Sequence, residues 1–187
     1  MSVAAVVLAA GASTRLGRAK QTLQLGGESL VERAVRVAQE AGCAPVIVVV
    51  NPEGNFGHRL QQRGCIVVVN ENSTEGMASS IRRGIVVARR LKAQGAVVMT
   101  CDQPGVLPEH LRALAADAAV MTGSAYAGRV GVPAYFPAAA FDALLALQGD
   151  TGARGLLRGA KSIPQEELGL DVDTEEDFRK AQALFEH

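Results

Sequence analysis

The sequence contains no tryptophan, and only 4% of its residues are aromatic. Proteins that bind single-stranded nucleic acid by base stacking rely on aromatic side chains, so this composition argues against that class. An excess of positive charge is also missing, because 19 basic residues balance 19 acidic ones and the net charge is zero. Dedicated nucleic-acid binders usually have a basic excess. We therefore expect no nucleic-acid partner.

Cysteine is scarce, and Cys43, Cys65 and Cys101 form no C-x-x-C motif. An odd number of scattered cysteines, with three scattered histidines, argues against a disulfide framework or a structural zinc site. Long hydrophobic runs are absent too. The first apolar run, residues 3–10, has no basic residue before it and is far shorter than a membrane span. We therefore expect a cytoplasmic chain with reduced thiols and no membrane partner.

The sequence does contain enough apolar residues for a core, since 48% of its 187 residues are hydrophobic. This length predicts a single domain over residues 1–187. Short apolar runs rich in β-branched residues recur without polar alternation, which is typical of parallel strands buried on both faces. These expected strands cover residues 3–10, 45–50, 65–69 and 96–100.

Segments with helical spacing lie between and after these runs. Ser29 and Glu32 form a capping-box pattern that begins a helix, and Gly42 is a plausible stop. The other expected helices cover residues 55–62, 79–93, 108–118, 137–147 and 174–185, with an extended segment near 130–136. Alternating strands and helices predict an α/β fold, a three-layer α/β/α sandwich with a mostly parallel, Rossmann-like sheet.

The segment that follows the first strand, L-A-A-G-A-S-T-R-L-G-R-A-K at 8–20, combines small residues with three cations. Ligands of open α/β sheets bind beyond the carboxyl ends of strands, where small residues let backbone N–H groups approach an anion. Arg15, Arg18 and Lys20 can then offset the charge of a polyphosphate. The glycine spacing fits neither the P-loop nor the dinucleotide fingerprint. The alternative is an ordinary turn with solvated charges.

This segment resembles the signature L-A-A-G-x-S-x-R-x-G-x-x-K of nucleotidyltransferases with a molybdopterin-guanine-dinucleotide-synthase-like fold. The resemblance implies a nucleotide-diphospho-sugar-transferase-like architecture. The form with Ala10 is similar to the molybdenum cofactor cytidylyltransferases, whereas guanylyl enzymes tend to have glycine there. The family loop surrounds a nucleoside triphosphate, so CTP is the favoured donor. The nucleotide-binding residues implied are Leu8, Ala9, Ala10, Gly11, Ser13, Arg15 and Lys20.

Asp102 ends the fourth apolar run in the motif C-D-Q-P. Mg²⁺ prefers oxygen ligands and often joins carboxylates to substrate phosphates, although an aspartate can also simply begin a turn before proline. The resemblance implies that Asp102 holds Mg²⁺ and that Asp173, in D-V-D-T-E-E-D, is the second metal ligand. Asp173 is equally suited to a helix start capped by Thr174, so both roles stay open. Arg15, Lys20 and Asp102 are the expected catalytic residues.

Residues 75–81, E-G-M-A-S-S-I, precede and begin the helix expected at 79–93. Free N–H groups and hydroxyls at a helix start can hold a base or ribose, and capping by Ser79 or Ser80 is the alternative. The resemblance to the cytidylyltransferases implies that Gly76, Met77 and Ser80 face the nucleotide.

Two later motifs concern the acceptor. G-D-T-G-A-R at 149–154 matches the family pattern, and we expect Asp150 and Arg154 either to pair beside the acceptor pocket or to contact its phosphate. G-R-V-G-V-P at 128–133 brings Gly131 to the same pocket but has Val132 where the family usually has histidine. Valine offers no donor, acceptor or titrating charge, so the identity of the acceptor stays open.

These motifs together predict Mg²⁺-dependent transfer of a nucleotidyl group, CMP from CTP, to a phosphorylated acceptor such as molybdopterin, with release of pyrophosphate. The alternatives are a sugar or polyol phosphate acceptor, or a non-catalytic carrier of molybdenum cofactor. A molybdenum enzyme or a cofactor-insertion protein is the partner that this function implies.

Overall fold

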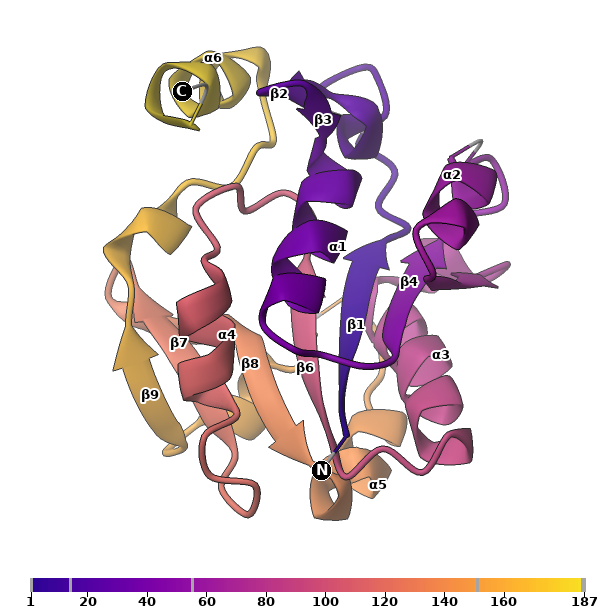
Figure 1. Ribbon diagram of the computed structural model, residues 1–187, viewed down its shortest axis with the longest axis vertical. Coiled ribbons are helices and arrows are strands. Elements are labelled where there is room, and N and C mark those ends of the chain that lie inside the picture. The colour runs from indigo at the N-terminus through magenta and orange to yellow at the C-terminus, as the bar shows by residue number, and fades with distance from the viewer. Residues whose placement is uncertain (1, 14, 55, 151, 186–187) are drawn as a thin grey trace.

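The computed structural model describes residues 2–13, 15–54, 56–150 and 152–185. Its middle layer is a seven-stranded sheet in the order β5-β4-β1-β6-β8-β7-β9, with helices on both faces (Figure 1). The four strands expected from the apolar runs run parallel to one another: β1 (Val3–Ala9), β4 (Val46–Val50), β5 (Ile66–Val69) and β6 (Gly95–Thr100). The three-layer α/β/α fold with a mostly parallel sheet is confirmed.

Burial separates the strands of this parallel half. Strands β1, β4 and β6 are almost wholly buried, because each has a neighbour on both sides and helices on both faces. Strand β5 lies at the edge of the sheet, where Ile66 is only partly buried and Val69 is 44% exposed. The expectation that this run is buried on both faces is therefore wrong, because composition does not distinguish an edge strand from a central one.

The other half of the sheet is partly antiparallel. The extended segment expected near 130–136 is β8 (Arg129–Pro137), which pairs antiparallel with β6 and with β7 (Thr122–Tyr126). Strand β9 (Lys161–Pro164) pairs parallel with β7. Strands β7 and β9, and the small hairpin of β2 (Gln24–Leu25) and β3 (Glu28–Ser29), were not expected, because they lack an apolar run.

The helices cover the two faces unequally. One face packs against α1 (Leu30–Glu40), α2 (Gly57–Gln62) and α4 (Pro108–Leu114), and the other against α3 (Met77–Arg90) and α5 (Phe141–Leu145). The capping box of Ser29 and Glu32 starts α1 as expected, and Gly42 follows the end of that helix with a φ of +86°. Helices α3, α4 and α5 are shorter than their expected ranges. Among the described helices, none is long and apolar enough to span a membrane.

A third apolar cluster joins the chain's two ends. The C-terminal helix α6 (Glu175–Phe185) lies beside the β2–β3 hairpin (Figure 1). Phe178 and Ala181 of α6 pack with Leu16 from the loop after β1 and with Leu25 from the hairpin. This packing brings the segment before α6 to the carboxyl edge of the sheet, where the loops after β1 and β6 also lie.

Candidate active site

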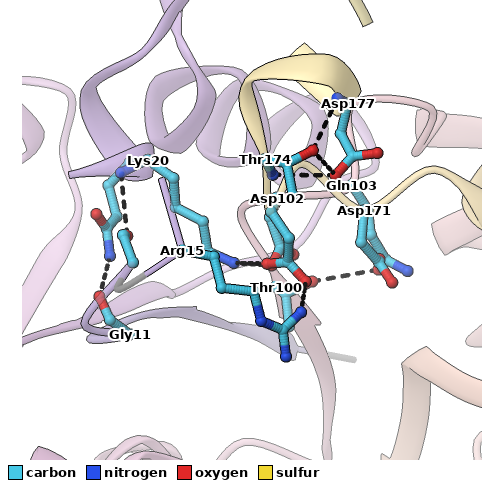
Figure 2. Close-up of polar contacts among 12 residues, drawn as sticks. Gly11, Arg15, Lys20, Thr100, Asp102, Gln103, Asp171, Thr174 and Asp177 are labelled. Carbon is cyan, nitrogen blue, oxygen red and sulfur yellow. Dashed lines mark hydrogen bonds and ion pairs between the residues drawn. The ribbon is translucent and has the colours of Figure 1, made fainter. Parts of the chain in front are cut away.

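Three segments far apart in the sequence meet at the carboxyl edge of the sheet. Strands β1 and β6 are neighbours, with Leu8 opposite Thr100. The loops that follow them therefore lie side by side. We call residues 10–20 the glycine-rich loop. Figure 2 shows Lys20 of this loop facing Asp102, which follows β6, with the segment 171–177 close by.

Lys20 forms the centre of a network of charges. Its Nζ lies 2.5 Å from Asp102 Oδ2 and 2.8 Å from Asp173 Oδ1. Arg15 Nη1 lies 3.5 Å from the other oxygen of Asp173. Burial alone would lower the pKa of Lys20, but the charges and hydrogen bonds of Asp102 and then Asp173 outweigh it and raise that pKa. Lys20 is therefore a fixed cation between two carboxylates.

Asp102 has an oxygen suited to a cation. Its Oδ1 is buried and has no hydrogen-bond partner among the residues that the structure describes, and the residue lines a cavity. A carboxylate oxygen in such a position matches the ligand that a hard divalent cation prefers. Within the described ranges, no three His, Cys, Asp or Glu side chains form a group that could hold a metal ion. A metal here would depend on Asp102, Asp173 and a substrate phosphate.

Asp171 adds a third carboxylate to this region. Burial raises its pKa to about 6, and the nearby charge of Asp102 acts in the same direction. Arg129 opposes the rise, and its Nη2 lies 3.3 Å from Asp171 Oδ2. Asp171 therefore extends the group of carboxylates, and Arg129 partly offsets its charge.

Asp173 lies just before the start of α6. Thr174 and Asp177 form the capping interaction at the start of α6, with Thr174 Oγ1 2.7 Å from Asp177 Oδ2 and 3.2 Å from the Asp177 nitrogen (Figure 2). Asp173 has no hydrogen bond to the backbone of α6 within the described ranges. Its carboxylate faces Lys20 and Arg15, and its negative charge also lies near the start of α6.

A residue that the sequence analysis did not select holds the glycine-rich loop in shape. Gln21 is 2% exposed, and its side-chain amide donates to the carbonyls of Ala9 (3.0 Å) and Gly11 (2.8 Å). Ser13 has a φ of +51°, and its hydroxyl accepts a hydrogen bond from the Lys20 backbone at 3.1 Å. These contacts join the two ends of the loop. The one sequence signal that could have identified Gln21 as a loop-holding residue is its position next to Lys20.

A cavity of about 220 Å³ lies beside the Lys20–Asp102 contact. Most of the expected nucleotide-binding residues line it, and we call it the nucleotide cavity. Its lining includes Leu8, Ala10, Gly11, Lys20, Gly76, Met77, Ser80, Asp102 and Asp150.

The other expected nucleotide-binding residues lie next to this cavity. The Ala9 carbonyl is bonded to Gln21, and Ser13 lines a neighbouring cavity of about 580 Å³. Arg15 is 75% exposed and reaches Asp173. Arg18, which we expected near the phosphates, instead pairs with Glu175 of α6 at 2.7 Å.

Capping by Ser79 or Ser80 is not what starts α3, because both residues lie inside the helix, which begins at Met77. Their hydroxyls accept hydrogen bonds from the buried side chain of Asn70, at 2.8 and 3.0 Å. The N–H groups of Met77 and Ala78 are not free either, since Asp150 Oδ1 and the Gly149 carbonyl accept from them. Ser80, which also lines the nucleotide cavity, is thus held in place from behind.

The residues expected at the acceptor lie together. Gly131, Asp150 and Arg154 line a cavity of about 150 Å³ next to Met77. A larger cavity of about 920 Å³ adjoins it and is lined by Arg129, Asp150, Arg154 and Arg158. The expected ion pair between Asp150 and Arg154 does not form among the residues described. Asp150 binds the start of α3 instead, and Arg154 has no ion-pair partner in the described part of the chain.

This chain resembles a known family over most of its length. Residues 5–167 match the family described as the MobA-like NTP transferase domain. The chain belongs to this family. A MobA-like NTP transferase is a nucleotidyltransferase that acts on a nucleoside triphosphate, and this activity agrees with a lysine and two carboxylates beside a glycine-rich loop.

Several curated proteins resemble this MobA-like chain. The "Purine catabolism protein PucB" of Bacillus subtilis is 32% identical, over 92% of each chain. A "Probable molybdenum cofactor guanylyltransferase" of Opitutus terrae is 33% identical over 56% of this chain and 50% of its own length. A "2-C-methyl-D-erythritol 4-phosphate cytidylyltransferase" of Geobacillus thermodenitrificans is 36% identical over 67% of this chain and 56% of its own length.

Solved structures share the whole fold. A nucleotidyl transferase from Methanothermobacter thermautotrophicus superimposes with a TM-score of 0.82 at 26% identity, covering 98% of this chain and 97% of that one. The protein Rv0371c of Mycobacterium tuberculosis, in complex with manganese, superimposes with a TM-score of 0.77 at 29% identity, covering 98% and 99%. A structure of this fold has therefore been obtained with a divalent metal.

Proposed function

We propose that this chain transfers a cytidylyl group from CTP to the phosphate of a molybdopterin-type acceptor, with Mg²⁺ as its metal. The observation that carries the proposal is the contact of Lys20 with Asp102 beside the nucleotide cavity. Residues 1–187 would act as one nucleotidyltransferase domain in the cytoplasm.

The proposed reaction joins two phosphates. An oxygen of the acceptor phosphate attacks the α-phosphorus of CTP, and the bond from that phosphorus to the bridging oxygen of the β-phosphate breaks. Pyrophosphate leaves with the electron pair of that bond. No protein base is needed, because the attacking phosphate is already ionised. Catalysis then depends mainly on positioning and on stabilisation of charge.

Lys20 and Arg15 supply that stabilisation in the proposal. Lys20 has a raised pKa and stays protonated, so its ammonium group can move from Asp102 to the β- and γ-phosphates and to the leaving pyrophosphate. Arg15 is 75% exposed and can turn from Asp173 toward the same oxygens. The small residues Ala10 and Gly11 let the backbone of the loop approach the phosphates closely.

Asp102 and Asp173 are the residues that would hold Mg²⁺. When bound, the metal would neutralise phosphate charge and orient the triphosphate. The orphaned Asp102 Oδ1 supports this assignment, and so does the contact of Asp173 with the same Lys20 ammonium group. Because both carboxylates bind this one ammonium group, they already lie close together.

Gly76, Met77 and Ser80 would contact the base and ribose, and the resemblance of Ala10 and of residues 75–81 to the cytidylyltransferases favours CTP over GTP. Gly131 and Arg154 would contact the acceptor. A molybdopterin-type acceptor is supported by the similarity of this chain to proteins described as probable molybdenum cofactor guanylyltransferases. Val132 in place of histidine and the methylerythritol-phosphate relative favour a polyol phosphate as the second candidate.

The proposal is tested by measuring pyrophosphate release. Purified protein is incubated with Mg²⁺ and CTP or GTP, together with molybdenum cofactor extract or a polyol phosphate, beside an Asp102→Ala control. We expect release with CTP and cofactor extract that the control lacks. Release with GTP, or with the polyol phosphate alone, would replace the proposed donor or acceptor. No release above the control with any triphosphate would overturn the enzymatic proposal.

A non-catalytic carrier is distinguished in the same experiment. A carrier would bind the molybdenum cofactor tightly whether or not Lys20 and Asp102 are present, and it would release no pyrophosphate. A product that carries CMP, identified by its mass, excludes this alternative. Capture of the product by a molybdenum enzyme would then identify the partner.

A further inference from the structure

Residues 147–150 are bound to the start of α3 by a series of polar contacts. Asp150 Oδ1 accepts a hydrogen bond from the Met77 nitrogen at 3.2 Å, and the Gly149 carbonyl accepts from Ala78 at 3.1 Å. One turn further along α3, Arg82 donates to the Leu147 carbonyl at 2.5 Å. A remote segment thus supplies the acceptor groups that usually come from a residue at the helix start itself.

The residue that precedes α3 cannot cap the helix with its own side chain, and Asp150 accepts the hydrogen bond instead. The residue before α3 is Gly76, which has no side chain to cap the helix and has a φ of +99°. A Cβ on Gly76 would lie 2.8 Å from the Gly149 carbonyl oxygen and 2.9 Å from Asp150 Cα. The two backbones therefore touch, and only glycine fits. Gly152 closes on Met77 in the same way, since a Cβ there would lie 2.8 Å from the Met77 sulfur.

The contact between Met77 and Asp150 lies between the nucleotide cavity and the 150 Å³ cavity, because both residues line both cavities. Met77 lines both the nucleotide cavity and the 150 Å³ cavity that contains Gly131 and Arg154. Asp150 lines both of these and the 920 Å³ cavity as well. A shift of residues 149–150 would move Met77, because the Asp150 carboxylate binds the Met77 nitrogen and the backbone of residues 149–150 touches Gly76.

We propose that Asp150 is a positioning residue for the nucleotide: its carboxylate holds the start of α3, and through it Met77 and Ser80, against the base and ribose. This inference rests on the proposed function and changes the role expected for Asp150, from a contact of the acceptor to a support of the nucleotide cavity.

The test compares Asp150→Ala with Asp150→Asn, because asparagine keeps an oxygen that can accept from Met77 whereas alanine does not. CTP affinity is measured by calorimetry without acceptor, and hydrogen exchange is measured at the amides of Met77 and Ala78. Loss of a helix cap costs on the order of 1 kcal/mol, so we expect Asp150→Ala to weaken CTP binding and to speed both exchange rates about fivefold. Asp150→Asn should stay within about twofold of the wild type.

Asp142→Ala is the matched control, since Asp142 also pairs with α3, through Arg89 at 2.6 Å, but is 89% exposed and lines none of these three cavities. The control should change neither readout. The proposal is overturned if Asp150→Ala leaves CTP affinity and exchange unchanged, or if Asp150→Asn loses CTP affinity as severely as alanine. The exchange readout needs no substrate, so the positioning role is tested even if pyrophosphate release fails.

Discussion

The nucleotide side and the acceptor side of the site differ in how their charges are held. On the nucleotide side, Lys20 and Arg15 are paired with Asp102 and Asp173 around a cavity of about 220 Å³. On the acceptor side, Arg154 and Arg158 border a cavity of about 920 Å³, and neither pairs with any residue within the described ranges. One side is organised before substrate binds, and the other is open and basic.

This difference follows from the two halves of the sheet. The nucleotide side lies on parallel strands β1 and β6, whose adjacent carboxyl ends fix the loops that carry Lys20 and Asp102. The acceptor side lies on the antiparallel strand β8 and on residues 152–159, which form turns and a short helix at Arg154–Leu157 rather than a strand. In the proposed function, the organised side would bind the nucleotide and the open side the phosphorylated acceptor.

The largest predicted effect comes from breaking the organised side at Asp102. Asp102→Asn removes one charge from the network around Lys20 with little change of shape, and we expect transfer to fall about 10²- to 10³-fold, the range typical for loss of one preorganised electrostatic contact. Pyrophosphate release measures it. Glu109→Gln is the control, because the Glu109 carboxylate is 72% exposed and pairs only with Arg112 among the described residues. An Asp102→Asn enzyme with near wild-type turnover would contradict the assignment.

The second prediction distinguishes the role of the Lys20 ammonium group from that of the metal ion. Lys20 neutralises both Asp102 and Asp173 before any substrate binds, so it competes with a divalent cation for them. Lys20→Met should weaken CTP binding about tenfold or more, as loss of a charge-assisted hydrogen bond does. The same substitution should tighten Mn²⁺ binding in the absence of nucleotide, measured by electron paramagnetic resonance. If both affinities fall together, the competition does not exist.

The third prediction concerns the open side. Arg154→Gln and Arg158→Gln should each raise the KM for acceptor about tenfold, because each removes a charge-assisted contact, and should leave the affinity for CTP unchanged. Steady-state kinetics at saturating CTP measure this. Arg83→Gln, an exposed arginine of α3 outside these cavities, should behave as wild type. Equal effects on both substrates would show that the two sides are not separate.

The smallest prediction concerns the scaffold beneath the site. Glu32 is buried, which would raise its pKa, but hydrogen bonds from Ser29 and then the charges of Arg59 and Arg63 outweigh burial and lower that pKa from its ordinary 4.5. A lowered pKa means that the ionised form stabilises the fold above pH 4.5 and that this contribution is lost as the pH falls. Glu32→Gln should therefore cost about 1 kcal/mol at pH 7.

Urea unfolding of the wild type and Glu32→Gln from pH 7 to pH 3 measures this cost. The difference between the two proteins should shrink toward pH 3, where the wild-type carboxylate becomes protonated. A difference that stays constant over this range would show that the ion pairs and the capping box do not depend on the charge of Glu32.

The nucleotide side was predictable from the sequence because its signals are local. The runs that form β1 and β6 are apolar and β-branched, and the adjacent strands bring the loops that follow them together. Asp102 lies two positions after β6, and the motif that resembles the family signature marks Lys20 at the end of the loop after β1. The capping interactions of Ser29 and Thr174 were predictable for the same reason. In each case the residues that interact lie within a few positions of a recognisable strand or helix.

The remaining features depend on contacts between distant segments. Strand β7, with the sequence T-G-S-A-Y, is too short and polar to mark itself as a strand. Gln21 and Asn70 act through hydrogen bonds that only the folded loops create. Asp150 and Met77 are separated by 73 positions, and no pattern near either residue indicates that they touch. Burial on both faces was expected for β5 because composition does not distinguish an edge strand from a central one.

The most direct test of the account is a crystal structure with a non-hydrolysable CTP analogue and Mn²⁺, in which anomalous scattering locates the metal. We expect the triphosphate on the glycine-rich loop, the metal bound to Asp102, and Lys20 moved from Asp102 to the phosphates. A triphosphate bound instead beside Arg154 and Arg158, with Lys20 still on Asp102, would contradict the account.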